Sequence, residues 1–108
     1  MKYCVMHNLS FETPAKRNEL EAAIQNNIVG KQTWGAVSMQ NGTDEEGHPL
    51  HSLAIRFQNR ADMDELFTLI KNKLDAIPVL KGKVSKHNCS HDEGTVHPCQ
   101  ITEEYSKG

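Results

Sequence analysis

The apolar positions along the chain follow two periods, one typical of β-strands and one typical of α-helices. Short apolar runs and two-residue alternation predict strands, over residues 3–11, 33–39, 51–58, 79–91 and 96–105. Apolar spacing of three to four residues predicts helices, over residues 13–29 and 59–77. The predicted order is strand, helix, strand, strand, helix, strand, with one further strand near the C-terminal end.

Local signals mark the ends of these elements. Thr13 can cap the first helix, Pro14 fits its first position, and Gly30 is suited to follow its end. Pro78 ends the second helix. The residues after Tyr105 are expected to fray.

The same pattern predicts which parts are buried. Residues 3–6 are apolar on both faces, which favours a central strand. The lysines of residues 79–91 favour an exposed sheet edge. Residues 41–49 predict a polar loop, and His48 and His51, which flank Pro49, are expected to face solvent.

This order of elements predicts an α+β fold, a ferredoxin-like βαββαβ plait with an antiparallel sheet, two helices on one face and a C-terminal β-hairpin extension. Residues 1–86 would form the ferredoxin-like domain, and residues 87–105 a Cys/His-rich hairpin extension of the same domain. The other sheet face stays open, with Arg56 and Gln58 on it. Because many functions share this fold, the fold does not select one.

Composition narrows the class of partner. The formal net charge is −2 and 24% of residues are charged, with both signs interspersed, so neither nucleic acid nor an anionic membrane is an expected partner. No apolar run is long enough for a signal peptide or a membrane helix, which predicts a cytoplasmic protein. Three cysteines in such a chain favour thiols or metal ligands over a disulfide framework.

A Cys/His cluster near the C-terminus is the sharpest chemical signal. It spans residues 87–99 with the spacing H-x-C-x-H, five residues, H-x-C. A hairpin bent symmetrically about Gly94 would bring four side chains to one face, namely Cys89, His91, His97 and Cys99. Two thiolates and two imidazoles form a tetrahedral zinc set, which predicts a structural zinc site with His87 as a spare ligand.

Three other interpretations of the cluster stay open. Cys89 and Cys99 could form a cross-strand disulfide. A different hairpin register would scatter the four groups over both faces as unligated surface residues. A catalytic Cys–His pair is the third alternative, although no orienting network is visible.

The first strand and the element order carry a family resemblance. Residues 1–8, ending in His7-Asn8, followed by helix, strand, strand and helix, resemble the small dimeric ferredoxin-like monooxygenases and haem-degrading enzymes. The haem-degrading relatives pair such an Asn with a Trp and a His of the second half, and the helix over 61–77 contains neither. The resemblance therefore implies a fold and no activity. Trp34, the single tryptophan, is expected to be packed.

These observations give three functional hypotheses. The first is a small non-enzymatic binding or regulatory protein with a zinc site. The second is a dimeric ferredoxin-like barrel, a homodimer through the open sheet face that binds a small ligand or acts as a small monooxygenase-like enzyme. The third is a protein-interaction module that uses the open face or the lysine edge, formed by Lys81, Lys83 and Lys86.

Overall fold

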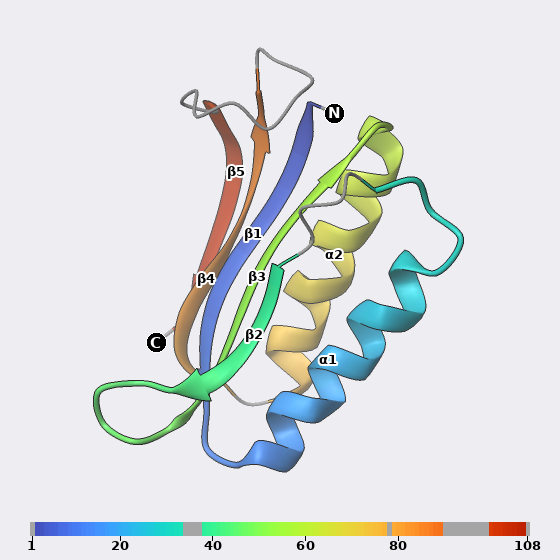
Figure 1. Ribbon diagram of the computed structural model, residues 1–108. Helices are drawn as coiled ribbons and strands as arrows, with labels where there is room; N and C mark the ends of the chain where they lie inside the picture. Colours follow the sequence, from blue (N-terminus) through green and yellow to red (C-terminus); the bar gives the residue numbers. More distant parts are fainter. Residues whose placement is uncertain (1, 34–37, 78, 90–99, 108) are drawn as a thin grey trace.

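In the computed structural model, an antiparallel sheet carries two helices on one face (Figure 1). The structure describes residues 2–33, 38–77, 79–89 and 100–107. The strands are β1 (Tyr3–Phe11), β2 (Ser38–Thr43), β3 (Pro49–Phe57), β4 (Val79–Asn88) and β5 (Gln100–Lys107). The helices are α1 (Pro14–Ile28) and α2 (Arg60–Ala76). The predicted α+β class with an antiparallel sheet is confirmed.

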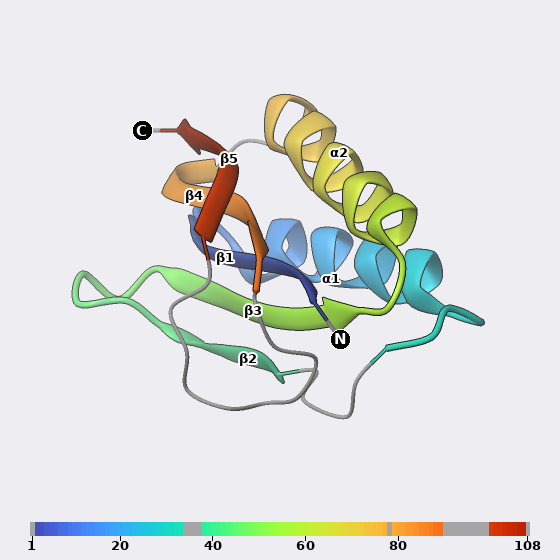
Figure 2. The same ribbon diagram turned by 90° about the horizontal axis from the view of Figure 1, so that it is seen from above.

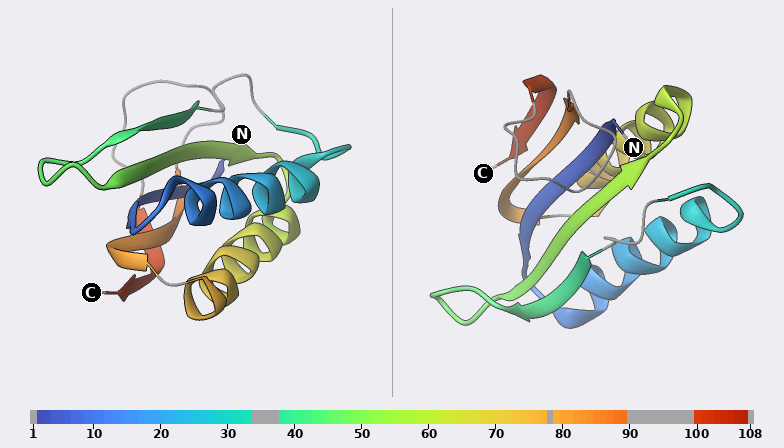
Figure 3. Two further views of the ribbon diagram at one scale, coloured as in Figure 1. Left: turned by 90° about the horizontal axis from the view of Figure 1, so that it is seen from below. Right: turned by 45° about the horizontal axis from the view of Figure 1, so that its top comes forward.

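The sheet order is β2-β3-β1-β4-β5, and every neighbouring pair is antiparallel. β1 lies at the centre, as its apolar start predicted, because both of its edges are hydrogen-bonded, to β3 and to β4. Both helices lie on the same side of the sheet, and the opposite face carries neither of them (Figures 2 and 3).

The core fills the space between the helices and the sheet. Alternate residues of the strands and one stripe of each helix form it: Val5, Leu9, Phe11, Leu20, Ile24, Leu53, Ile55, Phe57, Met63, Leu66, Phe67, Ile70, Leu74, Ile77 and Val84. Thr13 caps α1 as predicted, since its side chain accepts a hydrogen bond from the Lys16 backbone N–H.

The prediction that β4 is an exposed edge is wrong. β4 pairs with β1 on one side and with β5 on the other, so β5 occupies the edge of the sheet. Lysines suit β4 because acidic residues meet them: Lys83 pairs with Glu104 of β5, and Lys86 pairs with Asp64 of α2 and Glu103 of β5.

The C-terminal residues and the polar loop also differ from their predictions. β5 continues to Lys107 instead of fraying after Tyr105, because Lys107 Nζ donates to the Leu74 carbonyl of α2 at 2.9 Å. The predicted loop over 41–49 is partly strand, and its turn is confined to residues 44–48. Asp44 makes this tight turn by accepting the backbone N–H groups of Glu46 and His48, both at 2.9 Å.

His51 is not a solvent-exposed loop residue, as its neighbourhood predicted. It belongs to β3 and is fully buried. The alternation that buries Leu53, Ile55 and Phe57 extends back to His51, which places its imidazole on the helix-covered face. The strand pattern therefore outweighs the turn signal of Pro49.

Several predictions fall on residues that the structure does not describe. Trp34 lies within 34–37, and His91, His97 and Cys99 lie within 90–99, so all four are outside the described residues. Within the described part of the chain, neither helix has the length and apolar character needed to cross a membrane.

Candidate functional site

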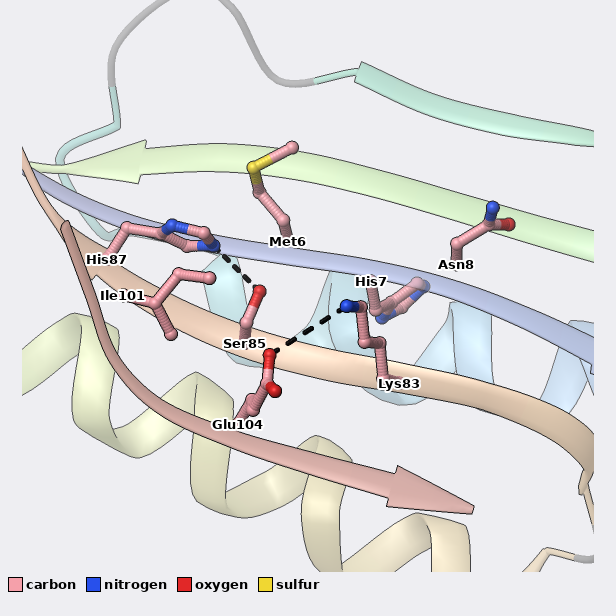
Figure 4. A pocket seen from close by; sticks show the side chains of 8 residues that line it. All are labelled: Met6, His7, Asn8, Lys83, Ser85, His87, Ile101 and Glu104. Carbon is pink, nitrogen blue, oxygen red and sulfur yellow. Dashed lines mark hydrogen bonds and ion pairs between the residues drawn. The ribbon is translucent and has the colours of Figure 1, made fainter. Parts of the chain in front are cut away.

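A groove lies on the sheet face that the helices leave uncovered. It has a volume of about 260 Å³ and runs over β1, β4 and β5 (Figure 4). The lining residues come from these three strands, namely Met6, His7, Asn8, Lys83, Ser85, His87, Ile101 and Glu104. His7 is a special case, since strand alternation puts its imidazole on the helix-covered face.

Strand register arranges these side chains in rows across the sheet. Met6, Ser85 and Glu104 are direct cross-strand neighbours, and His87 with Ile101 forms the next row. Ser85 stands in the middle strand between two longer side chains, so the small serine leaves a depression there. The concavity therefore follows from side-chain size at one central position.

Two large apolar side chains line the groove. Met6 is 44% exposed and Ile101 is 51% exposed, although most large apolar side chains of the described chain are buried. Both side chains flank one depression, and apolar surface beside a concavity is a feature of ligand-binding sites.

A serine and a histidine provide one polar edge of the groove. Ser85 Oγ and His87 Nε2 are 2.7 Å apart (Figure 4). Burial lowers the pKa of His87, Glu104 opposes this effect, and Lys83 adds to it. A neutral imidazole at pH 7 is the result, and it can exchange a hydrogen bond with Ser85 or with a bound molecule.

An ion pair provides the other polar edge. Lys83 Nζ lies 3.8 Å from Glu104 Oε2, and both side chains are about half exposed. Beside them, Asn8 Oδ1 accepts a hydrogen bond from Ser52 Oγ at 3.3 Å, so the amide nitrogen is the group that Asn8 can offer to a ligand. One cation and one anion beside a neutral imidazole give the groove no net charge.

The predicted zinc ligands are only partly described. Cys89 is buried and follows the last residue of β4, whereas His91, His97 and Cys99 lie outside the described residues. Cys89 is disulfide-bonded, and Cys4 is a free thiol. Because a disulfide sulfur is not a thiolate, Cys89 in this state does not offer a zinc ligand.

Residues 2–33, 38–77, 79–89 and 100–107 contain no three His, Cys, Asp or Glu side chains placed to hold a metal ion. The Cys89, His91, His97 and Cys99 set therefore stays a prediction. The last two described rungs of the β4–β5 pair join His87 to Ile101 and Asn88 to Gln100, and both have residue 94 at their midpoint.

The groove was not predicted from the sequence, although parts of its signal were visible. An open sheet face was expected, but the expected residues on it were Arg56 and Gln58 at the β3 end. Lys83 was assigned to an edge and Met6 to a buried run. Only the pairing of β5 with β4 brings Ile101 and Glu104 beside them.

Comparisons with known proteins identify no family for this chain. No protein-family model matches the chain, and no curated protein matches it in sequence. Among solved structures, the chain is similar to the C-terminal domain of the MgtC protein from Mycobacterium tuberculosis, determined in solution. That match has 14% sequence identity and a TM-score of 0.48, and it covers 86% of this chain and 92% of that chain.

Proposed function

We propose that this protein is a small ligand-binding module whose site is the groove on the open sheet face. The exposed Met6 and Ile101 side chains beside one depression carry this proposal, because apolar surface held open to water is stabilised when a ligand covers it. The volume suits a small organic molecule better than a macromolecule.

The chemistry of the walls favours a ligand without net charge. Lys83 and Glu104 already neutralise each other, and a charged ligand would meet one like charge as well as one opposite charge. Ser85, His87 and the Asn8 amide can all hydrogen-bond to a hydroxyl or carbonyl group. The expected ligand has an apolar body, which contacts Met6 and Ile101, and a neutral hydrogen-bonding end.

The fold that supports this site is, in the same proposal, a ferredoxin-like plait extended at one edge. The order of β2, β3, β1 and β4 in the sheet and the placement of both helices on one face support this assignment. β5 contributes one wall of the groove. By pairing with β4, it also makes β4 an inner strand, which forms the groove floor.

Three probes of similar size and different charge test the ligand class: benzyl alcohol, benzoate and benzylamine. In amide NMR spectra, benzyl alcohol is expected to shift residues 6–8, 83–87 and 101–104 most strongly. Met6→Lys should weaken this binding by about tenfold or more, a loss of about 1.5 kcal/mol, since it puts a hydrated ammonium where the ligand needs apolar contact.

Leu80→Lys is the matched control, because Leu80 is 40% exposed and does not line the groove. Equal shifts from all three probes, or shifts on the helical layer instead, would contradict the proposal. So would a stable dimer in light scattering in which those amides are already protected, because the occupant would then be a second copy of the chain.

A further inference from the structure

Two histidines meet inside the core on the helix-covered face of the sheet. His7 of β1 is 5% exposed and His51 of β3 is 0% exposed. His7 Nε2 lies 2.7 Å from His51 Nδ1, and the ring centroids are 4.9 Å apart. One hydrogen bond therefore joins the two imidazoles across neighbouring strands.

The outer nitrogen of each ring is not satisfied. His7 Nδ1 and His51 Nε2 are buried and have no hydrogen-bond partner in the described part of the chain. Whichever ring donates the shared hydrogen bond, the accepting ring carries its proton on the outer nitrogen, and the donating ring has a bare lone pair outside. The neutral pair therefore keeps a buried donor and a buried acceptor unpaired, which costs stability.

The surroundings favour the neutral state of both rings. Burial, as the main cause, and the neighbouring His51 together lower the pKa of His7 to about 3. Burial also lowers the pKa of His51; among the charged groups of α1, Glu21 opposes this effect and Arg17 adds to it.

The other elements around the pair contribute apolar groups. Leu53 of β3 and Val84 of β4 are the cross-strand neighbours of His7. The buried residues of α2 are all apolar, namely Met63, Leu66, Phe67, Ile70 and Leu74. In the described part of the chain, Glu21 favours an imidazolium at this position, and Arg17 of the same helix opposes it.

We propose that the His7–His51 pair makes this fold acid-sensitive, so that protonation of the pair opens the α1 side of the core to water. An imidazolium has two N–H donors and a charge to hydrate, whereas the rings are shut off from bulk solvent and the described residues provide no acceptor for the outer nitrogen. α1 packs on β1 and β3, the strands that carry the two rings, so displacement of α1 would admit water to them.

The direction of the pH effect follows from proton linkage. An ordinary histidine in the unfolded chain has a pKa of 6.5, above that of the buried rings. Between these values the unfolded chain binds more protons, so stability is full above about pH 6.5 and is lost as the pH falls toward 3. Each histidine lowers the folded-to-unfolded ratio by up to about tenfold per pH unit in this window.

Urea unfolding at pH 7, 6 and 5 tests the proposal. The wild type should lose at least about tenfold in folded-to-unfolded ratio between pH 7 and 5 relative to the His7→Leu/His51→Leu double variant, whose apolar pair cannot take up a proton. His48→Gln is the control, since it removes a half-exposed histidine and should retain the wild-type pH dependence. Parallel curves for the wild type and the double variant would overturn the proposal.

A second measurement needs no core variant and applies even if the double variant does not fold. Histidine ring signals of the wild type are followed by NMR as the pH is lowered. Both rings should stay neutral below pH 6 until the α1 amides lose protection from hydrogen exchange. A ring of the pair that titrates near pH 6.5, with the α1 amides still protected, would overturn the proposal.

Discussion

At the scale of single residues, Lys86 joins three elements. Its Nζ lies 2.8 Å from Asp64 Oδ1 of α2, 3.4 Å from Glu103 Oε1 of β5, and 5.1 Å from the centroid of the Phe67 ring. The hydrogen bond to Asp64 is the main cause that raises the pKa of Lys86, so its ammonium stays charged. One lysine therefore ties the edge strand to the helix.

Lys86→Met should destabilise the fold by about 1–2 kcal/mol, because it keeps the apolar stem and removes both ion pairs and the cation–π contact. Urea unfolding at pH 7 measures this loss. Lys16→Met is the control, since the exposed ion pair between Lys16 of α1 and Glu12, which precedes the helix cap, is worth about 0.5 kcal/mol or less. Equal losses in the two variants would contradict the role given to Lys86.

The two cysteines in the described part of the chain differ in oxidation state. Cys4 is a free buried thiol, and burial is the main cause that raises its pKa, whereas Cys89 is disulfide-bonded. The chain has three cysteines. Thiol titration in denaturant should therefore find one thiol without reductant and three with reductant.

Metal analysis of the same sample separates this state from the predicted zinc site. Protein purified without chelator should contain no stoichiometric metal while Cys89 is oxidised. Three titratable thiols without reductant, together with one zinc per chain, would contradict the disulfide. That result would favour the set of Cys89, His91, His97 and Cys99.

At the scale of elements, features that depend on residues close in the chain were predicted correctly more often than features that depend on which strands pair. The apolar stripe of α2 and the alternation of β3 are local, and both were confirmed by burial. The status of β4 depends on whether another strand pairs with it, and its lysines were misinterpreted because Glu103 and Glu104 lie on a strand whose register the sequence does not fix.

Gly82 illustrates a constraint between elements. Its φ is +143°, and a Cβ at this position would meet the Asn8 carbonyl oxygen and come within 2.8 Å of Leu9 Cα. At this φ a side chain would point into the paired strand β1, so only glycine fits. Gly82→Ala should cost more than about 3 kcal/mol in urea unfolding, since backbone atoms have to shift.

Gly30→Ala is the matched control for this prediction. Gly30 also has a positive φ, +77°, but nothing lies within 4 Å of the position a Cβ would take. The expected loss is about 1 kcal/mol, from backbone strain alone. A similar loss at both glycines would mean that conformation, and not the contact with β1, explains the cost at Gly82.

At the scale of the whole molecule, the one-sided helical layer determines where a site can form. The sequence predicted that one sheet face stays open, and the structure places both helices on the opposite face. It did not predict which residues lie beside one another there, because Met6 comes from a strand far from those of Ser85 and Ile101 in the chain. Their juxtaposition depends on the register of two strand pairs.

The central place of β1 also has a kinetic consequence. β1 is the first strand of the described chain to be synthesised, yet its partners are β3 and β4, which begin at Pro49 and Val79. Neither neighbour exists when β1 leaves the ribosome, so the middle of the sheet closes only after most of the chain has emerged. Pairing between strands so far apart in the chain slows folding relative to a helical bundle of the same length. Until these pairs form, the apolar β1 segment is exposed to other chains.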